Sequence, residues 1–155
     1  MSRVDFYILD QGGPKGKLQF ACRIVQKIRD LNLKVLVRTE DMANSETMDR
    51  MLWTFRQNSF IPHAIIPEGE LSWDDYPVQI SHDLHCHDRA DVLVNLKDKA
   101  SEQNLKYERV VELVSNDPGD KDSGRARYRY YRDQGIEPLT HNIGRGYNRQ
   151  STFIS

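Results

Sequence analysis

The alternation of apolar runs with helix-patterned segments near the start of the chain constrains the fold most. Residues 4–9 (VDFYIL) read as a buried strand, and residues 33–38 (LKVLVR) read as the next one. Between and after these strands, apolar residues recur at helical spacing, first at Leu18, Ala21, Cys22, Val25, Ile28 and Leu31, and then at Met48, Met51, Leu52 and Phe55. This strand–helix order predicts a parallel sheet with right-handed crossovers.

Later segments continue the pattern and bound the domain. Residues 91–96 and 107–114 are predicted strands, a last helix follows SNDPGD, and the stretch between about residues 66 and 90 reads as turn-rich. A chain of 155 residues is long enough for one hydrophobic core. We therefore expect a single α/β domain over residues 1–142, with a mainly parallel central sheet flanked by helices, and a C-terminal tail at residues 143–155.

Charge and cysteine content narrow the class of protein. A formal net charge of −1 argues against a general nucleic-acid binder, which usually carries a basic excess over a whole face. No apolar run is long enough for a signal peptide or a membrane span. Two cysteines do not make a disulfide framework. A cytoplasmic location without membrane contact is expected.

A glycine-rich turn, QGGPKGKL, lies between the first strand and the first helix, where phosphate-binding loops occur. Gln11 replaces the first glycine of the phosphate-loop pattern, and Leu18 replaces the hydroxyl residue that would hold magnesium. The turn from Gly12 to Lys17 is thus interpreted as an ordinary exposed turn. A nucleotide hydrolase that uses this turn remains the alternative from another functional class.

Titratable side chains also crowd into the segment HDLHCHD. Its potential metal ligands are His82, His85, Cys86, His87 and Asp88. A structural zinc site usually draws ligands from two separated clusters, and the sequence contains no second one. A solvated loop is the favoured interpretation, with a metal-dependent hydrolase as the alternative. We expect no catalytic residue, metal or cofactor.

The segment RARYRYYRDQG in the last predicted helix carries a row of cations. At 3.6 residues per turn, one stripe contains Lys121, Arg125, Arg129 and Arg132. Tyr128 adjoins the stripe, while Asp117 and Gly135 suit the two ends of the helix. Such a stripe is repulsive unless an anionic partner docks on it. A solvated helix face and direct stacking on nucleic-acid bases are the alternatives.

A second surface feature is Trp53, which falls off the apolar stripe of its helix and shares a face with Asp49. Phe60 follows shortly after this helix. Two large aromatic side chains displayed together would form a hot spot for a protein partner. The alternative is that Trp53 covers the edge of the core.

The order and spacing of several motifs resemble the chi subunit of bacterial DNA polymerase III holoenzyme. These motifs are FYILD, LW, SFIPH, PVQI, DVLVNL, VVELV and RARYRYYRDQG, and together they span nearly the whole chain. The segments HDLHCHD and IGRGYNRQSTFIS depart from the family pattern. The resemblance implies a fold similar to nucleotide-binding α/β proteins but without a working nucleotide site.

The resemblance also implies a function and partners. A chi subunit is a non-catalytic accessory subunit that joins the clamp loader, through the psi subunit, to single-stranded-DNA-binding protein, whose acidic C-terminal tail ends in phenylalanine. DNA contact is then mainly indirect. By motif position, the tail site would contain Lys121, Arg125, Tyr128, Arg129, Arg132 and Val114. The surface for psi, where a repair helicase of the family is also expected to dock, would contain Trp53 and Phe60.

Overall fold

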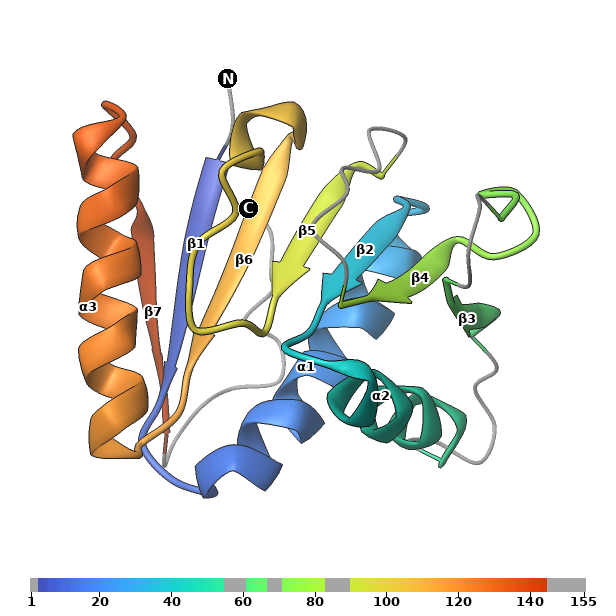
Figure 1. Ribbon diagram of the computed structural model, residues 1–155, viewed down its shortest axis with the longest axis horizontal. Helices are drawn as coiled ribbons and strands as arrows, with labels where there is room; N and C mark the ends of the chain where they lie inside the picture. The colour runs from blue at the N-terminus through green and yellow to red at the C-terminus, as the bar shows by residue number, and fades with distance from the viewer. Residues whose placement is uncertain (1–2, 55–60, 67–70, 83–89, 145–155) are drawn as a thin grey trace.

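The computed structural model describes residues 3–54, 61–66, 71–82 and 90–144 and shows one parallel sheet with helices on both faces (Figure 1). The strand order is β3-β4-β2-β5-β6-β1-β7, and every neighbouring pair is parallel. The elements are β1 (Arg3–Leu9), α1 (Gly13–Asp30), β2 (Val35–Arg38), α2 (Met42–Thr54), β3 (His63–Ile65), β4 (Val78–Ser81), β5 (Val92–Asn95), the short 3-10 helix η1 (Asn104–Lys106), β6 (Arg109–Val114), α3 (Pro118–Asp133) and β7 (Leu139–Ile143).

The two faces of the sheet carry different helices. α1 and α2 pack on one face, and α3 packs on the other over β1 and β6 (Figure 1). The side chains of consecutive β1 residues point to opposite faces of the sheet. Phe6 contacts Tyr128 of α3, whereas Tyr7 contacts Phe20 of α1. The crossovers β1–α1–β2 and β6–α3–β7 run in opposite directions along the sheet, so right-handed connections place their helices on opposite faces.

The sheet confirms the predicted α/β class and the strands predicted at residues 4–9, 33–38, 91–96 and 107–114. The prediction of a turn-rich middle is wrong at residues 78–81, which form β4, and the strand β3 at residues 63–65 was not predicted. These strands are three and four residues long, too short for an alternating pattern to stand out. β7 was also missed, because its residues are mixed in polarity and mostly exposed.

The ends of α3 follow the signals in the sequence. The Asp117 side chain accepts a hydrogen bond from the Asp120 N–H at 3.2 Å, which caps the helix. Gly135, with φ of 84°, adopts the left-handed conformation that stops the helix. The chain then returns as β7, which ends at Ile143, and residues 145–155 of the expected tail lie outside the described residues.

Candidate functional site

The outward face of α3 displays the predicted basic stripe. The side chains of Lys121, Arg125, Arg129 and Arg132 are all exposed. Arg125 forms an ion pair with Asp122 at 2.7 Å, and Arg132 lies 3.6 Å from Glu137. In the described part of the chain, Lys121 and Arg129 have no acidic partner. The stripe therefore retains uncompensated positive charge.

Beneath the stripe, α3 lies unusually close to the sheet. Val114 at the end of β6 is buried, with 4% of its surface exposed, and lies directly under Gly124. A Cβ atom at Gly124 would come within 2.8 Å of Val114 Cγ2. Val114 therefore supports the helix from below and contributes little exposed surface of its own.

Tyr128 marks the border of the stripe. It is half-buried against Phe6, with ring centroids 5.4 Å apart, and its hydroxyl group lies 3.5 Å from Glu137. The aromatic body thus packs on the sheet while its polar end stays near water, so the stripe has an apolar edge.

The inward face of α3 holds a buried polar network that sequence reasoning missed. Arg127 Nε lies 2.8 Å from Glu112 Oε1, and its Nη2 donates to the Leu113 carbonyl at 3.1 Å. The Tyr131 hydroxyl donates to Glu112 Oε2 at 2.6 Å, and the Asn95 amide donates to the same carboxylate. The signal in the sequence was the pairing of Arg127 with Tyr131 one turn later, opposite a glutamate in an apolar strand.

Burial governs the electrostatics of this network. It raises the pKa of Glu112, whereas the Arg127 charge and the hydrogen bonds from Tyr131 and Asn95 act in the opposite direction. Burial and the neighbouring Glu112 carboxyl also raise the pKa of Tyr131 above its ordinary value. Arg127 therefore holds α3 on the sheet and does not belong to the exposed stripe.

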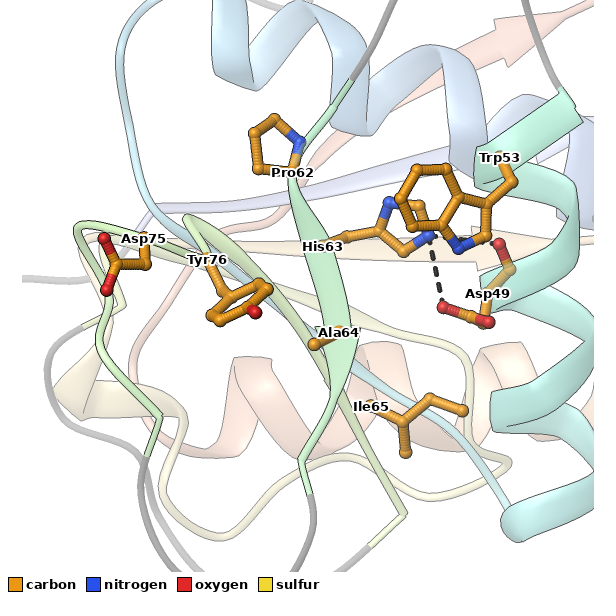
Figure 2. Close-up of a pocket in the computed structure, with 8 residues that line it drawn as sticks. All are labelled: Asp49, Trp53, Pro62, His63, Ala64, Ile65, Asp75 and Tyr76. Carbon is orange, nitrogen blue, oxygen red and sulfur yellow. Dashed lines mark hydrogen bonds and ion pairs between the residues drawn. The ribbon is translucent and has the colours of Figure 1, made fainter.

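The second candidate surface is a hollow between α2 and the edge strand β3, with a volume of about 760 Å³ (Figure 2). Trp53 is 50% exposed there, so the expectation that its side chain lies off the core stripe is confirmed. The hollow is lined by Asp49, Trp53, Pro62, His63, Ala64, Ile65, Asp75 and Tyr76. Phe60, the other aromatic residue expected at this surface, lies outside the described residues.

His63 joins β3 to α2 at the floor of the hollow. It is buried, its Nδ1 lies 2.7 Å from the Ile61 carbonyl oxygen, and its Nε2 lies 3.2 Å from Asp49 Oδ1. The Trp53 ring lies over the imidazole with centroids 4.4 Å apart (Figure 2). This contact fixes the exposed indole, and sequence reasoning did not anticipate it.

Two groups of the glycine-rich turn, the Gly13 N–H and the Lys17 side chain, are bound to other parts of the protein. The Gly13 N–H at the start of α1 donates to Asn116 Oδ1 at 2.9 Å, and Lys17 Nζ lies 3.1 Å from Asp120 Oδ2. Burial opposes ionisation of Asp120, but the Ser115 N–H and the Lys17 charge outweigh it and lower the pKa of this carboxyl. The Gly13 N–H and the Lys17 ammonium group are thus already bound to side chains just before and within the first turn of α3.

The histidine cluster gives no site that can be built from the structure. His82 is the one member of the cluster in the described ranges, and the other members lie outside them. Across residues 3–54, 61–66, 71–82 and 90–144, no three histidine, cysteine or acidic side chains are arranged to hold a metal ion. No helix in the described part of the chain has the length and apolarity needed to cross a membrane.

The fold and its surfaces define a parallel α/β domain that carries a cationic helix face and a separate aromatic hollow. The model of the family described as DNA polymerase III chi subunit, HolC, matches residues 1–138. The chain belongs to this family of DNA polymerase III chi subunits.

Relatives with this name cover nearly the whole chain. The DNA polymerase III subunit chi of Pseudomonas aeruginosa is 32% identical, covering 94% of this chain and 99% of its own. The Haemophilus influenzae protein of the same name is 29% identical, covering 90% and 96%, and that of Escherichia coli is 28% identical, covering 88% and 95%. The names of these relatives agree with the resemblance of the sequence motifs to the chi subunit family.

A solved structure shares the fold at low sequence identity. The S. cerevisiae Dbp5 C-terminal domain, in a structure with Gle1 and IP6, aligns with a TM-score of 0.55 and 9% identity over 92% of this chain and 90% of its own. At this identity the similarity concerns the architecture alone.

Proposed function

We propose that the chain is a non-catalytic, cytoplasmic accessory subunit of the replicative DNA polymerase that bridges psi and single-stranded-DNA-binding protein. In this role, α3 binds the acidic C-terminal tail of single-stranded-DNA-binding protein. The observation that carries the proposal is the row of exposed cations on α3, two of which have no acidic partner in the described part of the chain. Family membership supports the assignment to the polymerase assembly.

The chemistry of an acidic tail fits this helix face. Aspartate side chains and a terminal carboxylate need a row of cations, for which the forked guanidinium group of arginine is well suited. A terminal aromatic ring needs an apolar edge, which Tyr128 supplies beside the stripe. Val114 acts from below, because its contact with Gly124 sets the height of the helix above the sheet.

The partner psi is assigned to the hollow at Trp53 and to Phe60. In the sheet order, β3 is at one edge, while α3 packs over β1 and β6 near the other edge (Figure 1). The two surfaces are thus separated by the width of the sheet, so both partners can be bound at once. A repair helicase would compete with psi for the same hollow.

Contacts at the glycine-rich turn support a role without nucleotide chemistry. Lys17, the residue that would reach a phosphate, is bound to Asp120, and both side chains are only 12% exposed. Phosphate binding there would require this ion pair to break. We infer that the turn holds α1 to α3 as a structural joint.

The test compares one variant at each surface. Arg129→Ala should weaken binding of a short acidic peptide ending in Pro-Phe by about tenfold, near the net value of one charge-assisted hydrogen bond, and leave psi binding unchanged. Trp53→Ala should show the reverse pattern, with psi binding weakened by about thirtyfold, as for an interface hot spot. Calorimetry with the peptide and with psi measures both affinities for each variant.

Thermal melting of each variant serves as the control for folding. Equal loss of both partners in a variant that melts like the unmodified protein would contradict two separate surfaces. Arg125→Ala should have a smaller effect on the peptide than Arg129→Ala, because the peptide must displace Asp122 from Arg125.

A further inference from the structure

The outer edge of β3 presents unpaired backbone groups. Among the described strands, β3 pairs with β4 alone, and the Ile66 N–H donates to the Ile80 carbonyl at 2.8 Å. Because successive residues of a strand direct their backbone groups to opposite sides, Ala64 faces β4 as Ile66 does. The N–H and C=O groups of His63 and Ile65 therefore point to the open edge, where none of them has a hydrogen-bond partner in the described part of the chain.

In the described part of the chain, no other strand pairs with the outer edge of β3, and the strand itself carries no lysine or arginine. Exposed edge strands are normally protected by short length, proline, charged side chains, bulges or a covering element, of which β3 shows the short length and the preceding Pro62. Here the strand crosses the floor of the hollow, with Trp53 on one side and Tyr76 on the other (Figure 2). Their side chains are 50% and 40% exposed, so an added strand would lie between two partly exposed aromatic side chains.

The charge of the hollow indicates the chemistry of the added strand. Among the described residues, its lining includes two aspartates and no lysine or arginine. Asp49 is bound to His63, whereas the carboxylate of Asp75 has no ion pair in the described part of the chain. A cation beside Asp75 could stack on the Tyr76 or Trp53 ring, an arrangement that favours arginine.

We propose that an extended, basic segment of the partner adds to the sheet at β3. The segment pairs with the backbone of His63 and Ile65 and places an arginine or lysine side chain beside Asp75. This proposal rests on the proposed function, because it takes psi as the partner and describes how psi is held. It also explains why a three-residue strand at the sheet edge is locked to α2 through His63.

Amide hydrogen exchange of the full chain, measured by NMR with and without the purified psi subunit, tests the strand addition. The His63 and Ile65 amides should exchange at least about tenfold more slowly in the complex, because each gains a hydrogen bond or is covered by the added strand. The amide of Ile66, already bonded to β4, serves as the internal reference. Psi binding at Trp53 without protection of these two amides would overturn the strand addition and leave the proposed function standing.

A pair of adjacent aspartates supplies a matched test of charge. Asp75→Asn should weaken psi binding by about three- to tenfold, as for one ion pair at an interface rim. Asp74→Asn should change it by less than about twofold, because Asp74 is 91% exposed, pairs with Lys34 and does not line the hollow. Equal effects of the two variants would overturn the basic segment. No binding of psi even to the unmodified protein would overturn the proposed function together with this inference.

Discussion

The two faces of α3 use the same residue type for opposite purposes. Arg127 is 2% exposed and holds the Glu112 carboxylate, whereas Arg129, two residues later, is exposed and has no acidic partner in the described part of the chain. The inner arginine attaches the helix to the sheet, and the outer one leaves its charge available to a ligand. The comparison shows that an arginine cluster in a sequence is not one functional unit.

Replacing each arginine with alanine is the strongest test of this difference. Arg127→Ala should lower the free energy of unfolding by about 3 to 5 kcal/mol, because it leaves a buried carboxylate without its partner. Arg129→Ala should change the same quantity by less than about 0.5 kcal/mol, since an exposed side chain away from packing contributes little. Urea denaturation of both variants measures the contrast. Similar losses would show that the two faces are not distinct.

The close approach of α3 to β6 predicts a smaller effect. Gly124→Ala should destabilise the protein by about 1 to 3 kcal/mol, because its Cβ would overlap the branched side chain of Val114. The double variant with Val114→Ala should recover part of this loss, since it removes both γ carbons that cause the clash. Gly119→Ala, in the exposed first turn, is the comparison: its Cβ would lie 3.2 Å from Asp117 Oδ2, an exposed side-chain atom that can shift, so it should cost less stability than Gly124→Ala. Thermal melting distinguishes the three variants, and a stabilising Gly124→Ala would contradict the close packing.

The smallest predicted effect concerns the ion pair between Lys17 of α1 and Asp120 of α3, whose contribution to stability should depend on pH. The pKa of Asp120 is lowered in the folded protein, so its contribution to stability is present above the ordinary value of 3.8 and is lost as the pH falls through the lower folded value. Asp120→Asn should therefore cost about 1 kcal/mol at neutral pH and make stability less dependent on pH in the acid range. Chemical denaturation at a series of pH values measures the slope. Parallel curves for the two proteins would refute the role of this carboxyl.

Much of the fold could be predicted from residue patterns. The long strands β1 and β6 are nearly continuous apolar runs, and α1 shows a clear helical repeat, so local sequence was sufficient there. The short strands β3, β4 and β7 could not be predicted in this way, because three to five residues carry too little pattern and their pairing depends on distant neighbours.

For the candidate sites, spacing along a helix placed the outward cations correctly. It did not identify His63, whose contacts come from Ile61 and from Asp49 on another element. It also gave no account of Asp75 and Tyr76, which approach Trp53 from the far side of β3 (Figure 2). Contacts between elements that are separate in sequence follow from the sheet order, which local spacing does not contain.

By itself, the sequence determined the parallel α/β class, the ends of α3 and the stripe of Lys121, Arg125, Arg129 and Arg132, because strand alternation, helix capping and helical periodicity are local properties of the chain. The tertiary structure alone decided that Arg127 is buried while Arg129 is exposed, and that Lys17 is bound to Asp120. Those outcomes depend on which distant carboxylate each cation meets, and only the packing of α1 and α3 against the carboxyl ends of β1 and β6 brings the partners together.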